Sequence, residues 1–260
     1  MISDYKKPIN TKTFISATVA ASYEEQHSRH DYLQRSLSII GADTTISVDT
    51  SYLMMGYNFN TIKTSGHLSL NHKINKKNLI KTGVNLDVFS LFQSDSVLYD
   101  LDSPDNFKNR WDYSGTQLLA QPFVQWKYRA SDNLDFTVGL HSQYYSNANS
   151  LSPLEPRTAI KYRFKNNQSV FAGAGLHSQM QPLYTYSYHQ LDANGNKIYQ
   201  NQDMGLMKSV HSGLGYEKTF DKGFSIKTEA YYQYLYLSLI HISEPTRLLS
   251  ISYAVFGLKK

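Results

Sequence analysis

A charged stretch in the second half of the chain offers side chains that could do chemistry. In EPRTAIKYR, Glu155, Arg157, Lys161 and Arg163 all occupy odd-numbered positions. An extended chain would place them on one face. A carboxylate among cations could bind a charged ligand, or the four charges could pair with one another as a structural ladder. Both interpretations require this segment to be a strand.

The strands expected next along the chain add polar groups to the same face. FAGAGLHSQ places His177 and Gln179 at alternate positions, after two glycines that suit a close approach or relieve strand curvature. AYYQYLY places Tyr231 and Gln233 at the same spacing. On alternation alone, the sequence predicts six residues facing a ligand path: Glu155, Arg157, His177, Gln179, Tyr231 and Gln233.

Two further groupings could bind a metal, and both are poor sites. His27 and His30 in HSRHD supply too few ligands for a defined metal site. LDANGNKIYQN begins with a calcium-loop spacing, but Lys197 occupies the position that needs glycine. Asn194-Gly195 instead predicts a type I′ hairpin turn between YTYSYHQ and KIYQ. We therefore expect no metal.

Enzyme chemistry is not indicated either. No serine-histidine-aspartate order, glycine-rich phosphate loop or pair of carboxylates stands out. The net charge of +5 comes from scattered lysines and arginines, which does not predict nucleic-acid binding. Cysteine is absent, which excludes disulfides and thiolate chemistry. We expect no catalytic residues and no cofactor.

Alternation of apolar and polar residues dominates the chain. IKTSGHLSLNHKI sets Ile62, Leu68 and Leu70 against Lys63 and His67, as the two faces of a pleated strand. The same period of two recurs along the chain and predicts about nine strands. Their expected bounds are 12–23, 58–74, 79–93, 116–130, 134–146, 154–165, 169–179, 207–220 and 224–236.

Short and long connections alternate between these strands. NKKN, SDN, NNQ and DKG, at 75–78, 131–133, 166–168 and 221–223, are hairpin turns. Long irregular segments are expected at 25–55, 94–115 and 180–205. Within the first, residues 31–41 have apolar residues at helical spacing, so they could form a short helix or an ordinary loop.

These features favour an antiparallel transmembrane β-barrel over a soluble β-sandwich. The strands are longer than those of globular sheets, the two rims differ in loop length, and tyrosine and tryptophan stand near strand ends. No run of 18 apolar residues predicts a spanning helix, and MISDYKKPIN lacks the apolar core of a signal peptide. The chain is therefore cytosolic, or its natural N-terminus lies upstream.

Two long blocks carry a resemblance to a known family. LEPRTAIKYRFKNNQSVFAGAGLHSQMQPLYTY and MKSVHSGLGYEKTFDKGFSIKTEAYYQYLY resemble the C-terminal barrel half of TonB-dependent outer-membrane receptors. The likeness is to the type with a carboxypeptidase-regulatory-like domain, and it covers roughly 11–236. It implies a 22-stranded barrel, a plug and nutrient import energised by the TonB complex. The TonB box, the plug and more than half of the strands are missing here, and no ligand residues carry over.

The end of the chain resembles translated DNA of non-biological origin rather than a protein family. LSLIHISEPTR, residues 237–247, resembles the translation of the adapter used in transposase-based sequencing libraries. ISYAVFGL, residues 251–258, resembles the translation of that adapter's far end, with Gly257 departing from the expected cysteine. We expect 237–260 to be a non-native tail without a defined place in the fold.

The sequence thus predicts an all-β chain. Residues 1–236 form a partial, unclosed outer-membrane barrel domain, and 237–260 form the adapter-derived tail. The expected function is import of a siderophore, glycan, peptide or cobalamin across the outer membrane of a Gram-negative-type envelope. The expected partners are outer-membrane lipid, the TonB complex through the plug, and the nutrient. Two alternatives remain: a small complete barrel acting as adhesin or enzyme, and a soluble β-sandwich binding module.

Overall fold

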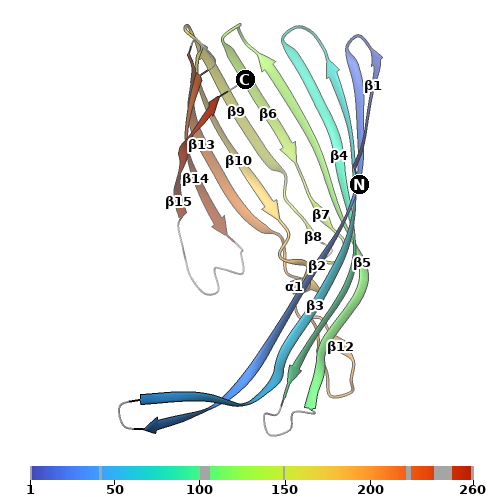
Figure 1. Cartoon of the computed structure of the whole chain (residues 1–260). Coiled ribbons are helices and arrows are strands. Elements are labelled where there is room, and N and C mark those ends of the chain that lie inside the picture. Colours follow the sequence, from blue (N-terminus) through green and yellow to red (C-terminus); the bar gives the residue numbers. More distant parts are fainter. Residues whose placement is uncertain are drawn as a thin grey trace.

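One curved antiparallel sheet makes up most of the molecule (Figure 1). The computed structural model describes residues 2–40, 43–99, 106–148, 150–220, 224–236 and 248–258. The long strands are β1 (Ile2–Asn10), β2 (Thr13–Ile40), β3 (Asp43–Lys73), β4 (Asn78–Leu98), β5 (Phe107–Arg129), β6 (Leu134–His141), β9 (Glu155–Phe164), β10 (Gln168–Gln179), β13 (Met207–Thr219), β14 (Phe224–Tyr236) and β15 (Leu248–Leu258). The connections carry β7 (Tyr144–Tyr145), β8 (Ser150–Leu151), α1 (Leu183–Ser187), β11 (Gln190–Leu191) and β12 (Lys197–Ile198).

Sequence neighbours pair throughout the sheet. The order is β1-β2-β3-β4-β5-β6-β9-β10-β13-β14-β15, and β1 and β15 form its two edges. Among the residues that the structure describes, no pairing joins one edge to the other. The predicted all-β sheet that does not close is therefore confirmed. The nine predicted strands correspond to β2 through β6, β9, β10, β13 and β14.

β1 and β15 were not predicted. The expectation that the tail takes no part in the sheet is wrong for 248–258, which pair with β14 across a register shift between Lys227 and Glu229. An open sheet edge presents unpaired N–H and C=O groups, and any extended segment can satisfy them by backbone pairing alone. Residues 237–247 and 259–260 lie outside the described residues. The pairing therefore does not test where 237–260 come from.

The two rims of the sheet differ as the sequence predicted. β2, β4, β6 and β10 each follow the preceding long strand after a short turn, and these turns share one rim, at the top in Figure 1. In the turn between β9 and β10, Asn166 and Asn167 both have positive φ, as a type I′ turn requires. The predicted turn at 221–223 lies outside the described residues. The opposite rim carries the long connections 142–154 and 180–206.

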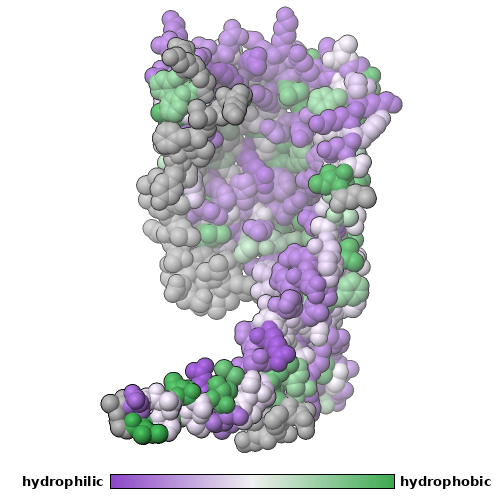
Figure 2. All heavy atoms as spheres, viewed as in Figure 1, coloured by the Kyte–Doolittle hydropathy of each residue, from purple (hydrophilic) through white to green (hydrophobic). Residues whose placement is uncertain are grey.

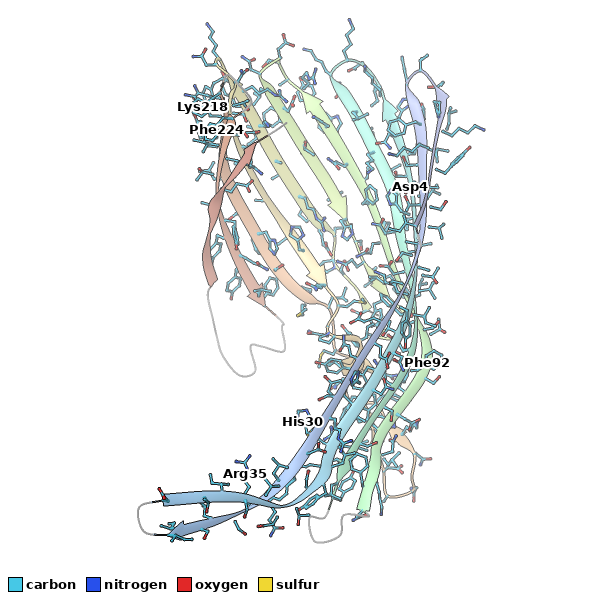
Figure 3. The ribbon with its side chains drawn as sticks, in the orientation of Figure 1. Asp4, His30, Arg35, Phe92, Lys218 and Phe224 are labelled. Carbon is cyan, nitrogen blue, oxygen red and sulfur yellow. The ribbon has the colours of Figure 1, made fainter. Side chains whose placement is uncertain are left out.

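The expectation of an irregular first loop is wrong. β2 and β3 instead continue as one hairpin to the pair Ile40 and Asp43, and residues 31–40 are extended rather than helical. Register shifts at His30/Asp31 and Gln34/Arg35 accompany a sharp bend, which Figure 3 shows beside the labelled Arg35. Most side chains along this extension are exposed, so backbone pairing holds it without a buried face. β4 and β5 likewise extend into the segment expected to be irregular at 94–115.

Polar side chains face the hollow and apolar side chains face outward. On β3, Leu68 is 53% exposed while its neighbour Ser69 is 2% exposed. Figure 2 shows hydrophilic side chains along the rim of short turns and across the concave wall. A soluble sandwich would bury the apolar face against a second sheet, and a complete small barrel would close. The single open sheet matches neither alternative. No helix in the described part of the chain is long and apolar enough to span a membrane.

The buried apolar cluster lies on the concave side, at the rim of long connections. It consists of Phe89, Leu91, Leu119, Tyr145, Tyr186 and Leu206. The first three belong to β4 and β5, whereas Tyr186 and Leu206 belong to the connection between β10 and β13. That connection therefore folds inward and packs against strands that are not its neighbours in the sheet.

Candidate ligand-binding site

The six predicted site residues share the concave face, as alternation predicted. Arg157 lies opposite Gly175, His177 opposite Ser209, and Gln233 opposite His211. Directly opposed residues of paired strands project to the same side. The structure brings Glu155 and Arg157 together, and His177 lies close beside them on β10. Gln179 lies farther along β10, and Tyr231 and Gln233 lie on the same wall across the sheet on β14, beyond β13.

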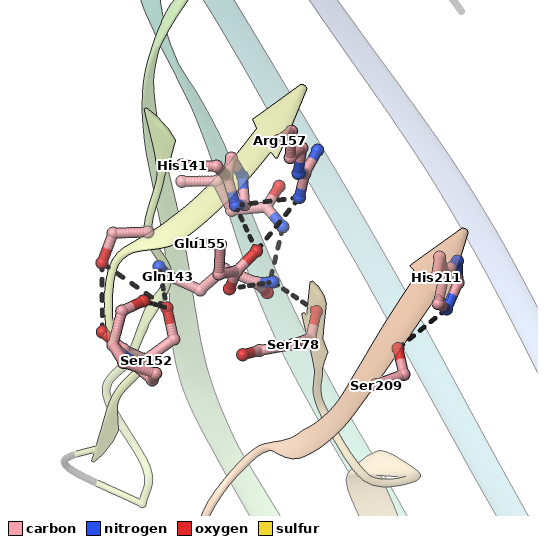
Figure 4. Close-up of polar contacts among 11 residues, drawn as sticks. His141, Gln143, Ser152, Glu155, Arg157, Ser178, Ser209 and His211 are labelled. Carbon is pink, nitrogen blue, oxygen red and sulfur yellow. Dashed lines mark hydrogen bonds and ion pairs between the residues drawn. The ribbon is translucent and has the colours of Figure 1, made fainter. Parts of the chain in front are cut away.

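Glu155 is the centre of a buried polar cluster (Figure 4). Its side chain is 1% exposed, and its Oε2 atom lies 2.9 Å from His141 Nδ1 and 3.0 Å from Arg157 Nη2. Oε1 accepts a hydrogen bond from Gln143 Nε2 at 3.3 Å. Gln143 also donates to the Ser178 carbonyl of β10. Both carboxylate oxygens are therefore satisfied within the protein.

Several other charges of this wall are paired as well. Asp135 accepts from Arg163 and lies 3.6 Å from both Lys127 and Arg129. Lys161 pairs with Glu217 at 3.4 Å, and Lys63 pairs with Asp87 at 3.2 Å. These pairs favour the structural ladder over the ligand site for EPRTAIKYR. They fix adjacent strands in register on the polar side of the sheet.

Two histidines meet on the concave wall beside Arg157. The rings of His177 and His211 lie 4.4 Å apart between centroids, and Ser209 Oγ lies 2.8 Å from His211 Nε2. The alternation of SVHSGLGY would have placed His211 on this face, but it was not among the predicted residues. Within the described ranges, no group of three or more histidine or acidic residues is arranged to hold a metal. His27 and His30 lie exposed on β2.

A cavity that the sequence did not predict lies where the inward-folded connection meets the concave wall. Its volume is about 470 Å³, and its lining includes Tyr57 and Phe59 of β3, Trp111 of β5, and Tyr184 and Tyr188 from the β10–β13 connection. Phe59 stacks on Tyr57 at 4.7 Å and on Tyr184 at 5.6 Å between ring centroids. We call these five side chains the aromatic pocket. Strand alternation could have placed the first three on the concave face, but not the last two.

The predicted hairpin at 191–201 exists with a different turn. β11 and β12 pair, and Gly195 has φ of +82° while Asn194 does not have positive φ. Asp192 N donates to Asn196 O, and Gly195 N donates to Asp192 O, which describes a type I turn followed by a glycine bulge rather than type I′. YTYSYHQ, residues 184–190, is also not a strand, because α1 extends through Ser187. Hydrogen bonds from Asn196 lower the pKa of the Asp192 carboxyl.

Solved structures of a transporter and of a receptor superpose on this sheet. The copper transporter OprC superposes with a TM-score of 0.57 at 12% identity, over 90% of this chain and 39% of that chain. The siderophore receptor PirA from Pseudomonas aeruginosa covers 89% of this chain and 45% of its own, with a TM-score of 0.49 and 14% identity. The sheet is therefore similar in fold to part of a TonB-dependent receptor barrel.

Sequence comparisons add nothing to that similarity. No protein-family model and no curated protein sequence matches the chain. The chain spans less than half the length of either solved receptor. The similarity to a TonB-dependent receptor barrel is therefore one of fold.

Proposed function

We propose that this chain is part of an outer-membrane receptor that imports a scarce nutrient with energy from the TonB complex. The observation that carries the proposal is the inverted distribution of polarity in one open sheet. Charged and amide side chains pair on the concave wall, and leucine, isoleucine, tryptophan and tyrosine cover the convex one. Such a sheet is stable where its outer face meets hydrocarbon and its inner face meets water.

The aromatic residues near the rim of short turns support a membrane boundary there. Trp126 stacks on Tyr128 at 5.6 Å, and Tyr162 packs on Phe164 at 4.7 Å, all on the convex face. Trp126 Nε1 also donates to Asn78 Oδ1 at 2.9 Å. Rings with an apolar body and a polar tip are enriched at the two membrane interfaces. This rim would face the periplasm, because bacterial barrels have short periplasmic turns.

The partners follow from this placement. Lipid would cover the convex face, the nutrient would enter from the rim of long connections, and a plug domain would couple the barrel to the TonB complex. None of these steps requires a catalytic residue in this chain. In a larger barrel, the free edge of β1 and the edge of β14 that β15 covers here would pair with further strands, because unpaired backbone groups are costly in hydrocarbon.

The two tryptophans test the membrane placement directly. Trp126 lies 44% exposed on the convex face, and Trp111 lies 4% exposed on the concave face. Two single-tryptophan variants, Trp111→Phe and Trp126→Phe, are folded into bilayers that contain brominated lipid. Quenching of the Trp126 emission but not of the Trp111 emission supports the proposal. Equal quenching of both, or of neither, contradicts it.

We also propose that residues 237–260 are translated adapter. The support is the consecutive match of LSLIHISEPTR to the adapter translation. Long-read sequencing of the source DNA across codon 236 tests this. Codons for further alternating strands in place of LSLIHISEPTR support the proposal, whereas the same codons in genomic DNA refute it.

A further inference from the structure

The aromatic pocket is built from distant parts of the chain. The stack of Tyr57, Phe59 and Tyr184 joins β3 to the β10–β13 connection. Trp111 is 4% exposed and packs edge-on against Tyr188 at 5.8 Å. Tyr184 is 45% exposed, so one member of the stack remains open to an incoming molecule. The pocket lies on the concave side, at the rim of long connections.

One polar residue of this pocket has a hydrogen-bond acceptor to spare. Asp95 on β4 accepts from Arg110 Nε and from Trp111 Nε1, each at 3.0 Å, and both bonds reach Oδ2. Oδ1 has no hydrogen-bond partner in the described part of the chain, although the side chain is only 7% exposed. A buried acceptor of this kind is costly unless a donor reaches it. Gln93 Oε1, two residues earlier on the same face, is also buried without a hydrogen-bond partner in the described part of the chain.

The remaining polar groups of the pocket are neutral or already paired. Arg110 and Asp95 form an ion pair and lie in the lining together, so the pair adds no net charge. Gln26 and Asn201 supply amides from β2 and from the β10–β13 connection. Asn201 Nδ2 donates to the Thr185 carbonyl at 3.0 Å, which fixes the orientation of its amide. The site therefore offers no net charge to select an ionic ligand.

These features together select a ring with hydroxyl donors on its edge and C–H groups on its face. The C–H face of a pyranose is weakly positive and complements the negative face of an aromatic ring. A hydroxyl on the same ring can donate to Asp95 Oδ1, and its oxygen can accept from an amide or from Arg110. A ferric catecholate complex brings acceptors rather than donors, so it would leave Asp95 Oδ1 without a hydrogen-bond partner.

We infer that the aromatic pocket binds a pyranose unit of a neutral oligosaccharide at the external mouth of the barrel. This inference rests on the proposed import function and names its substrate class. The ring would lie against the exposed side of the Tyr184 stack, with a hydroxyl directed to Asp95. The β10–β13 connection would cover the ring, because it contributes Tyr184, Tyr188 and Asn201 to the lining.

Binding is measured on the full chain folded in detergent, in a Trp126→Phe background where Trp111 is the remaining tryptophan in the sequence. The probes are maltohexaose, cellohexaose, xylohexaose and mannohexaose, with ferric enterobactin as the anionic comparison. We expect at least one oligosaccharide to change the Trp111 emission saturably. Tyr184→Ala should lower the affinity for that oligosaccharide by about tenfold or more, which is the loss expected for one aromatic contact.

Two further variants separate binding from folding. Tyr162→Ala removes an aromatic ring of similar exposure, 41% against 45%, from the convex face, and should leave the affinity within about twofold. Asp95→Asn keeps the shape but exchanges an acceptor for a donor, and should weaken binding by about tenfold. Near-UV circular dichroism establishes that each variant is folded.

The outcomes distinguish this inference from the proposed function. The oligosaccharide inference is overturned if none of the four oligosaccharides binds at roughly 10 mM. It is also overturned if Tyr184→Ala and Tyr162→Ala lose the same amount of affinity. Binding of ferric enterobactin in their place also overturns it. The import proposal survives these results as long as brominated lipid quenches Trp126 selectively, and it fails if that quenching is absent.

Discussion

Glu155→Gln removes one charge from the most buried ion pair of the concave wall while keeping the shape of the side chain. Glu155 accepts from Gln143 at 3.3 Å, and its other oxygen lies 2.9 Å from His141 Nδ1 and 3.0 Å from Arg157 Nη2. The amide retains one acceptor oxygen, but its NH₂ group faces partners that were donating. At least one favourable contact therefore becomes unfavourable.

The expected loss in the free energy of unfolding depends on how exposed each partner of Glu155 is. Loss of one member of a fully buried pair costs about 3–5 kcal/mol. Arg157 has a side chain that is 42% exposed and can turn toward lumen water, which limits its share to about 1 kcal/mol. His141 is 12% exposed, and its hydrogen bond to a charged group is worth about 1.5–2 kcal/mol. We expect the free energy of unfolding to fall by about 2–3 kcal/mol.

The assay is guanidinium-induced unfolding in detergent micelles, followed by tryptophan fluorescence. Glu217→Gln is the matched control on the same wall, because Glu217 and Lys161 are 38% and 40% exposed. The free energy of unfolding of this control should fall by less than about 1 kcal/mol. Equal losses for the two variants, or a loss below about 0.5 kcal/mol for Glu155→Gln, would refute the assignment of Glu155 to a buried structural ladder.

Two other perturbations probe the sheet and its outer hairpin. In Gly83→Ala the new Cβ would lie 2.4 Å from the Leu68 carbonyl oxygen, which should cost about 1–3 kcal/mol in the same titration. Gly66→Ala meets nothing within 4 Å, so its change should stay below about 0.5 kcal/mol, and similar losses would contradict the packing. Because hydrogen bonding lowers the pKa of Asp192, its turn should be fully stabilised above the ordinary aspartate pKa and should loosen as pH falls through the lowered value. The protection factor of the Asn196 amide, which is its exchange rate by NMR relative to the intrinsic rate at the same pH, reports this. The same pH dependence of the protection factor in Asp192→Asn would contradict the expectation.

The period of two allowed the strands and their faces to be predicted from the sequence. Lipid outside and water inside impose opposite polarity on successive residues, so EPRTAIKYR and IKTSGHLSL predict both the strand and the side that each residue faces. The concave placement of Glu155, Arg157 and His177 follows from that rule. The same rule failed at 24–40, where both faces of the hairpin are exposed and no polarity contrast marks the strand.

The sequence predicted where the short turns lie, but not the backbone conformation of every turn. Asn166-Asn167 forms the short type I′ turn, because asparagine tolerates positive φ. At Asn194-Gly195, the Asp192 carboxylate instead accepts from the amides of Asn194 and Asn196 and stabilises a different turn. Competition between a side chain and the preferred dipeptide turn is difficult to judge from residue types alone.

The sequence by itself determined nine strands of the sheet, their polar and apolar faces and the positions of the short turns, because these depend on residues one or two positions apart. Only the tertiary structure decided that the β10–β13 connection folds inward and that Tyr184 meets Phe59 and Trp111 meets Tyr188. Those contacts join residues far apart in the chain, and no local period records them. Packing of the long connection against the concave wall therefore built the pocket that strand alternation did not reveal.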